Sequence, residues 1–149
     1  MRVAIGADHA GFQLKQEIAR LLAADGHEAL DVGAHTLDAD DDYPDFAVAV
    51  GESVRNGEAD RGIVVCGSGV GSSVAANKLK GVRASVCHDT YSAGQGVEHD
   101  DLNVLCLGGR IVGISLATEL VRAFLGATYD GGPRFARRLN KVLDAERRG

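Results

Sequence analysis

Short runs of β-branched and other apolar residues alternate along the chain with longer segments whose apolar residues recur every three or four positions. The short runs are typical of buried strands, and the longer periodicity is typical of amphipathic helices. In the first helical segment, Leu14, Ile18, Leu21 and Leu22 form one apolar stripe that ends before Gly26. The pattern predicts strands at Arg2–Gly6, Glu28–Val32, Gly62–Cys66, Val82–Cys87 and Asn103–Leu107.

The later helices are marked by their ends as well as by their periodicity. Proline fits the first turn of a helix, where its missing N–H is not needed, and glycine commonly follows the last turn. Helices are therefore predicted from Pro44 to a stop at Gly57, from near Ser72 to near Gly81, over Thr90–Glu98, over Ile114–Leu125 and from Pro133 onward.

Strands that alternate with helices predict a parallel sheet with helices on both faces, because parallel neighbours need long crossover connections. The expected fold is a Rossmann-like, three-layer α/β/α domain with a five-stranded parallel sheet and an additional C-terminal helix. No repeat or linker divides the chain, so residues 1–149 are expected to form one domain. Ligands of such sheets bind beyond the carboxyl ends of the strands. If the loops after the first and third strands share one site, the strand order begins 2-1-3.

The net charge and the cysteines indicate which kinds of binding partner and which cellular location to expect. The formal net charge of −5 argues against nucleic acid or an anionic membrane as the main partner, since both attract a broad excess of Lys and Arg. The first apolar run reaches Asp8 and His9 too early for a signal peptide or a membrane span, so a cytoplasmic protein is expected. Cys66, Cys87 and Cys106 lack paired metal-ligand spacing and are expected to be free thiols.

A glycine-rich loop follows the third predicted strand and precedes a helix. Glycine at alternate positions lets consecutive backbone N–H groups point at one anionic group, next to the partial positive charge of the helix N-terminus. The pattern matches neither the dinucleotide fingerprint nor a Walker A loop. A tight turn without a ligand is the alternative interpretation. The candidate anion-binding residues are Gly67, Ser68, Gly69, Val70 and Gly71.

Cys66 stands at the mouth of this loop. Backbone N–H donors and a helix N-terminus stabilise a thiolate there, so the residue is a candidate base or nucleophile. Cys87 and Cys106 are interpreted as small hydrophobic core residues, which is the usual role of cysteine at the end of a buried strand.

Two histidines lie near strand ends. His9 follows Asp8 directly after the first strand, and His99 precedes Asp100 shortly before the fifth. We expect both histidines to face the same rim of the sheet as Cys66. A metal site is the less favoured alternative, because no HxH or HExxH spacing occurs.

Arg134 and Arg138 lie four residues apart on the last predicted helix. Both guanidinium groups therefore project from one face and are able to fork onto one phosphate. In isolation the pair fits a solvated basic face better than a phosphate site.

Together these residues resemble a known family. The segments GADHAGFQLK, DYPDFA, CGSGVGSSVAANK, GVRAS and EHDDLNVLCLGGR and the ending GG-x-R-x-x-x-R look like type B ribose-5-phosphate isomerase. Its wider family of sugar-phosphate isomerases also holds galactose-6-phosphate and allose-6-phosphate isomerases. The resemblance covers essentially the whole chain. It implies an aldose–ketose isomerase that works through an enediolate without metal or cofactor.

The resemblance also implies a role for each candidate residue. Cys66 would be the base that moves a proton between C1 and C2 of the sugar, while the loop N–H groups hold the enediolate oxygens and Ser68 assists at an oxygen. His99, with Asp8 nearby, would open the furanose ring, and Tyr43 would line the sugar pocket. The phosphate ligands would be His9, Arg110, Arg134 and Arg138.

The family builds its site from two subunits, which implies a homodimer or a dimer of dimers with a shared site. One branch of the family carries Glu in the first turn of the loop helix and Gly in place of the cysteine. This chain has Ser72 and Cys66 at those positions and therefore resembles the cysteine type.

Three departures from the family pattern leave the sugar open. Asp100 stands where the family normally has Asn, Gly94–Glu98 replaces a more basic stretch, and Pro133 is an extra residue before the arginine pair. The expected partner is a small phosphorylated sugar, with ribose 5-phosphate and ribulose 5-phosphate as the main hypothesis. Another aldose phosphate of four to six carbons and a non-catalytic sugar-phosphate binding module are the alternatives.

Overall fold

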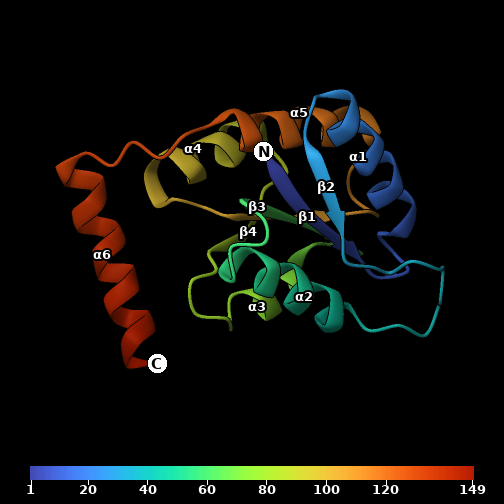
Figure 1. The fold of residues 1–149 in the computed structure, drawn as a ribbon, viewed down its shortest axis with the longest axis horizontal. Helices are drawn as coiled ribbons and strands as arrows, with labels where there is room; N and C mark the ends of the chain where they lie inside the picture. Colours follow the sequence, from blue (N-terminus) through green and yellow to red (C-terminus); the bar gives the residue numbers. More distant parts are fainter.

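The computed structural model describes residues 1–149, and its strands form one parallel sheet in the order β2-β1-β3-β5-β4 (Figure 1). The predicted three-layer fold and the order beginning 2-1-3 are confirmed. Cys66 pairs with Gly108 in the register of β3 and β5, so the loops after these two strands leave the sheet side by side. The strands are β1 (Arg2–Ala7), β2 (Glu28–Asp31), β3 (Arg61–Cys66), β4 (Ala84–Val86) and β5 (Val104–Gly108).

Helices cover both faces of the sheet. α2 and α3 lie on one face, whereas α1, α4 and α5 lie on the other (Figure 1). α6 stands apart from both layers, and none of its residues is buried. None of the helices combines the length and the apolar composition that a membrane span requires. The helices are α1 (Phe12–Ala24), α2 (Tyr43–Arg55), α3 (Val70–Ala76), α4 (Thr90–Asp100), α5 (Ile114–Gly126) and α6 (Pro133–Arg148).

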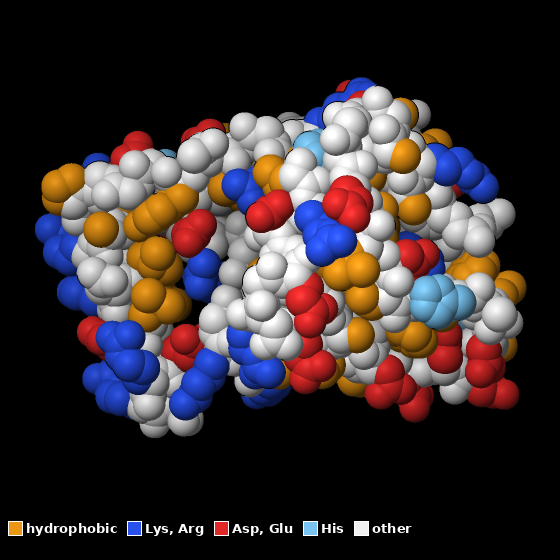
Figure 2. Space-filling model, in the orientation of Figure 1, with side chains coloured by type: hydrophobic (Ala, Val, Ile, Leu, Met, Phe, Trp, Pro, Cys, Tyr) orange, Lys and Arg blue, Asp and Glu red, His pale blue; other side chains and the backbone are white.

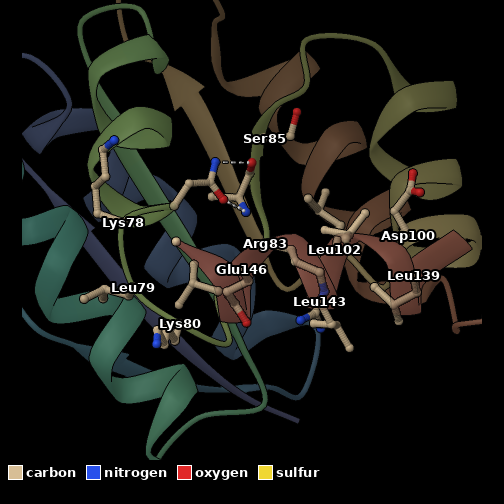
Figure 3. Close-up of a pocket in the computed structure, with 15 residues that line it drawn as sticks. Lys78, Leu79, Lys80, Arg83, Ser85, Asp100, Leu102, Leu139, Leu143 and Glu146 are labelled. Atoms are coloured by element: carbon tan, nitrogen blue, oxygen red, sulfur yellow. Dashed lines mark hydrogen bonds between the residues drawn. The ribbon is translucent and has the colours of Figure 1, made fainter.

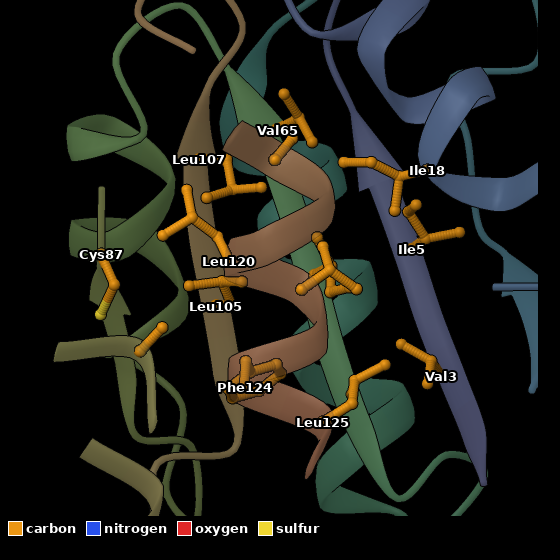
Figure 4. Close-up of a cluster of buried hydrophobic side chains, with 14 of the residues drawn as sticks. Val3, Ile5, Ile18, Val65, Cys87, Leu105, Leu107, Leu120, Phe124 and Leu125 are labelled. Carbon is orange, nitrogen blue, oxygen red and sulfur yellow. The ribbon is translucent and has the colours of Figure 1, made fainter. Parts of the chain in front are cut away.

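The apolar core is divided between the two faces of the sheet because successive strand residues point to opposite sides. Val3 and Ile5 of β1 belong to the larger cluster, in which the strands pack against α1, α4 and α5 (Figure 4). Ala4, between them, belongs to the smaller cluster under α2 and α3. Every strand residue of β5 is buried, as expected for a strand that is covered on both faces.

Close approach of α2 to the sheet depends on glycine. A Cβ atom at Gly62 of β3 would overlap the Val50 side chain of α2. The absence of a side chain at this point lets the helix pack directly on the strand. The start of α2, at Tyr43, is thereby held close to the carboxyl end of β3.

The predicted boundaries are least accurate around α3 and β4. α3 ends at Ala76, before the expected stop near Gly81, and β4 begins at Ala84, after the expected Val82. The Asn77 side chain accepts a hydrogen bond from the Ala84 backbone N–H and donates to the Ala84 carbonyl, both at 2.8 Å. The Asn77 side chain thus connects the residue after the end of α3 directly to the first residue of β4.

A buried charge fixes the loop that follows β2. Lys15 of α1 is 1% exposed, and its ammonium donates to the two carboxylate oxygens of Asp31 at 2.9 and 3.0 Å. It also donates to the Ala34 carbonyl at 2.6 Å. These bonds tie α1 to the beginning of the segment that leads to Asp41 and Tyr43.

Candidate active site

The loops after β1, β3 and β5 meet at the carboxyl edge of the sheet. The Gly109 N–H donates to the Cys66 carbonyl at 2.7 Å, and the Arg110 N–H donates to the Gly67 carbonyl at 3.1 Å. On the other side, a Cβ at Gly11 would overlap the backbone carbonyl of Val65, so the turn after β1 packs directly against β3. Three chain segments that are distant in sequence therefore form one surface.

A cleft of about 380 Å³ opens on this surface. Half of the residues predicted to form the site line it, and Ile111 joins them although no motif of the sequence pointed to it. The lining residues are Asp8, Tyr43, Cys66, Gly67, Ser68, Gly71, Arg110 and Ile111.

The Cys66 thiol lies at the base of the glycine loop. Its side chain is almost fully buried, and the backbone N–H of Gly69 donates to Sγ at 3.2 Å. Gly69 has φ = 82°, a left-handed conformation that glycine adopts without steric cost and that turns this N–H back toward the sulfur. The Ser68 hydroxyl accepts a bond from the Val70 N–H at 3.3 Å. The loop thus presents a thiol, a hydroxyl and backbone donors together.

The other two cysteines have different surroundings. Burial raises the pKa of the Cys87 thiol, and burial raises that of Cys106 much further. Both belong to the apolar clusters of the core. They remain protonated at neutral pH, in agreement with their predicted role as core residues.

Tyr43 forms one wall of the cleft by packing on the glycine loop. A Cβ added to Gly71 would lie 2.7 Å from the Cε2 and Cζ atoms of the Tyr43 ring. The ring therefore lies directly against the loop backbone, and residue 71 must lack a side chain for this contact to form.

Asp8 and His9 are both held by hydrogen bonds. One Asp8 carboxylate oxygen accepts from the backbone N–H groups of Ala10 at 3.0 Å and Gly11 at 3.2 Å. Asp41 accepts from Nδ1 of His9 at 2.7 Å, and this hydrogen bond raises the pKa of His9 above its ordinary value. Asp41 was not among the predicted site residues. It belongs to the acidic run at positions 40–42, and the sequence does not show which of these carboxylates faces the histidine.

Asp8, His9 and Asp41 are also the residues that come nearest to a metal-ligand set. They place one potential ligand atom each within 4.8 Å of one another. His9 Nδ1 and Asp41 Oδ1 are, however, already hydrogen-bonded to each other. The arrangement is explained by this ion pair, and we assign no metal to it.

His99 and Asp100 lie at the opposite edge of the sheet from Cys66 in the same chain. α4 begins after the carboxyl end of β4 and runs back over about 16 Å before the chain enters β5. The expectation that His99 faces the same rim as Cys66 is therefore wrong within one chain, because a crossover helix must return the chain to the amino edge. The His99 ring stacks on Phe135 of α6, with ring centroids 4.5 Å apart.

The beginning of α6, which carries Arg134 and Arg138, also lies at this amino edge, next to His99. A second cavity, of about 740 Å³, lies between α6 and the segment that connects α3 to β4 (Figure 3). Asp100, Leu139 and Leu143 line it. We call His99, Asp100, Arg134 and Arg138 the amino-edge group, and we call the cleft residues together with His9, Gly69 and Val70 the carboxyl-edge group.

The fold and the carboxyl-edge group define a class of protein: a parallel α/β enzyme with a thiol, a carboxylate, a glycine loop and an arginine at the switch point of its sheet. The family model described as "Ribose/Galactose Isomerase" matches residues 3–142. The chain belongs to this family and is an isomerase.

Individual relatives cover nearly the whole chain. "Ribose-5-phosphate isomerase B" of Escherichia coli is 46% identical over 147 residues, which are 99% of this chain and 97% of the relative. "D-erythrulose-4-phosphate isomerase 2" of Mycolicibacterium smegmatis is 42% identical over 98% of this chain and 97% of the relative. The solved structure of Mycoplasma genitalium ribose-5-phosphate isomerase B with bound ribulose-5-phosphate has a TM-score of 0.93 and 40% identity, and the match covers 99% and 97% of the two chains.

Proposed function

We propose that this isomerase interconverts ribose 5-phosphate and ribulose 5-phosphate, with Cys66 as the base. The observation that carries the proposal is the position of the Cys66 thiol beneath the glycine loop, in a cleft that Asp8, Tyr43 and Arg110 also line. The relatives named as ribose-5-phosphate isomerases, one of them with ribulose-5-phosphate bound, support the choice of substrate.

The chemistry requires a base, donors for a developing oxyanion and a proton carrier. In the open-chain aldose, the Cys66 thiolate removes the proton from C2, and the electrons of the C–H bond form the C1–C2 double bond as negative charge moves to O1. Backbone N–H groups of the loop stabilise this enediolate. The Ser68 hydroxyl assists transfer of a proton between the oxygens, and the Cys66 thiol returns its proton to C1 to give the ketose.

Further groups are needed to bind the phosphate and to open the closed sugar ring. His9 and Arg110 bind the phosphate from the carboxyl edge, and this remote contact holds the sugar in register with Cys66. Arg134 and Arg138 add their guanidinium groups, while His99 opens the furanose ring. Since these last three residues lie at the amino edge of their own chain, a second subunit supplies them.

A homodimer, or a dimer of two such dimers, accounts for the exposed position of α6. No residue of α6 is buried, yet the helix carries an apolar stripe with Leu139, Val142 and Leu143 facing the cavity. Figure 2 shows hydrophobic side chains along α6 toward the body of the molecule and basic side chains along its outer side. A helix with such a face is stabilised by packing against another surface. We propose that contact with a second copy brings its amino-edge group to the carboxyl-edge group.

A shorter sugar phosphate is the second candidate substrate. The Mycolicibacterium smegmatis relative is named for a four-carbon ketose phosphate. In addition, Asp100 replaces an amide donor with a carboxylate next to His99. Comparing kcat/KM for four-, five- and six-carbon aldose phosphates distinguishes the candidates, and Asp100→Asn tests whether the carboxylate sets the preference. An unchanged preference in Asp100→Asn would remove this residue as a determinant.

Substitution of Cys66 tests the proposed function. Cys66→Ala is expected to lower kcat about 1,000-fold, the scale of a lost general base, while binding of ribose 5-phosphate remains nearly intact. Turnover is measured by a coupled assay and binding by calorimetry. The matched control is Cys87→Ala, which removes a core thiol and should retain activity. Binding without turnover in the wild-type protein would instead indicate a non-catalytic module, and persistent turnover in Cys66→Ala would exclude this base.

A further inference from the structure

One carboxylate oxygen holds both the backbone and the ring of His9. Asp41 Oδ1 accepts from the His9 backbone N–H at 2.9 Å and lies 2.7 Å from Nδ1. Because a carboxylate only accepts hydrogen bonds, Nδ1 carries the proton in this contact. The double contact fixes the ring relative to its own backbone and leaves Nε2 as the nitrogen free to meet a ligand.

The environment of Asp41 is unusual for a loop carboxylate. Its side chain is only 10% exposed, and Oδ2 is buried without any hydrogen-bond partner. An ionised group that loses water in this way costs free energy unless a positive charge lies beside it. His9 is the partner that can supply this charge, so the burial of Asp41 and the protonation of His9 support each other.

Three charged groups act on the His9 ring from different segments of the chain. Hydrogen bonding to Asp41, in the segment between β2 and α2, is the largest influence and raises the pKa of His9. The neighbouring Asp8 charge raises it further, whereas partial burial of the ring and the Arg110 charge after β5 lower it. The net effect is a histidine that stays protonated to higher pH than a free imidazole.

We propose that Asp41 is a positioning residue that keeps His9 oriented and cationic, so that His9 and Arg110 form a two-cation clamp for the phosphate of the sugar. The inference rests on the proposed function, which assigns phosphate binding to both cations. Asp41 itself does not touch substrate. Its contribution is made through the orientation and charge of His9.

The kinetic test compares two carboxylates of the same loop. Asp41→Asn is expected to raise KM for ribose 5-phosphate about ten-fold, since a charge-assisted contact is weakened, with kcat changed less than about two-fold. The KM difference from wild type should grow between pH 6 and pH 8, as His9 of the variant loses its proton earlier. Asp40→Asn removes an exposed neighbouring charge and should match wild type. Asp41→Glu, which keeps the charge, should recover part of the loss.

A second readout does not depend on turnover. The His9 ring is titrated by NMR in the wild-type, Asp40→Asn and Asp41→Asn proteins, and inorganic phosphate is then added as the probe. A lower titration midpoint and weaker phosphate binding in Asp41→Asn alone are the expected results. Equal midpoints, or equal phosphate affinity, would overturn the inference. An inactive wild-type protein would contradict the proposed function instead, while the titration still reports on the contact between Asp41 and His9.

Discussion

At the scale of single residues, the three cysteine thiols of this protein differ in chemistry because their surroundings differ. Cys66 faces the cleft and accepts a backbone hydrogen bond, whereas Cys87 and Cys106 belong to the apolar clusters. Burial raises the pKa of both core thiols, which keeps them in the unreactive protonated form. The difference can be measured without substrate.

Iodoacetamide at pH 7.5 is therefore expected to modify Cys66 first. Intact mass and peptide mapping should show one carboxamidomethyl group on Cys66 before any appears on Cys87 or Cys106. Ribose 5-phosphate should slow the reaction at Cys66 by occupying the cleft. Early modification of a core thiol, or no protection by the sugar, would argue against the assigned site.

The sequence was most informative about residues at the carboxyl ends of strands and in the first positions after them. Asp8, Cys66 and Arg110 were expected at one edge because the carboxyl ends of parallel strands share an edge, and the structure places all three around the cleft. Asp41 could not be singled out, because its contact with His9 depends on the path of a long loop. The prediction for His99 is wrong within one chain, because a residue that precedes a strand lies near the amino edge of a parallel sheet and not near its carboxyl edge.

At the scale of elements, the beginning of the strand order, 2-1-3, was predictable from the loops, but the positions of β4 and β5 and the ends of α3 and β4 were not. Periodicity reports which face of a helix is buried and gives little information on where the helix stops. Here the stop depends on Asn77, whose amide bonds the backbone of Ala84, and such a bridge between two segments leaves no pattern in the sequence. The same applies to Lys15, whose burial against Asp31 contradicts the usual placement of lysine.

Lys15→Met is expected to lower the free energy of unfolding by about 2 kcal/mol, because the Ala34 carbonyl and the Asp31 carboxylate lose a buried donor. The loss stays at this level because Asp31 is partly exposed and water can solvate it. Urea denaturation measures the change. Arg20→Met, on the exposed side of the same helix, is the matched control and should be close to neutral. Equal stability of the two variants would show that the buried ammonium contributes nothing net.

At the scale of the whole molecule, the two groups of candidate residues lie at opposite edges of one sheet. Cys66 lies at the carboxyl edge, at the end of β3, and His99 lies near the end of α4 at the amino edge, so under the proposed function neither group is a complete site by itself. A two-fold symmetric pair of chains would form two equal sites, each with Cys66 from one protomer and His99 from its partner. This arrangement can be tested by combining two inactive variants in one dimer.

Cys66→Ala and His99→Asn should each be nearly inactive with ribose 5-phosphate, but mixing them should restore activity. After unfolding and refolding of an equal mixture, half of the dimers are mixed, and each mixed dimer has one intact site. Activity should therefore recover to about a quarter of the wild-type value. Each variant refolded alone is the control. No recovery, with mixed dimers verified by native mass spectrometry, would place both residues in the same subunit's site.

The placement of α6 outside the body of its own chain has a thermodynamic consequence. In the proposed dimer, a sugar phosphate that contacts Cys66 of one protomer and Arg138 of the other would act as a reversible cross-link between them. Any ligand that binds only the paired form must strengthen the pairing by the same factor by which pairing strengthens its own binding. Specific activity is therefore expected to fall when the protein is diluted, and saturating substrate should move that loss to lower protein concentration.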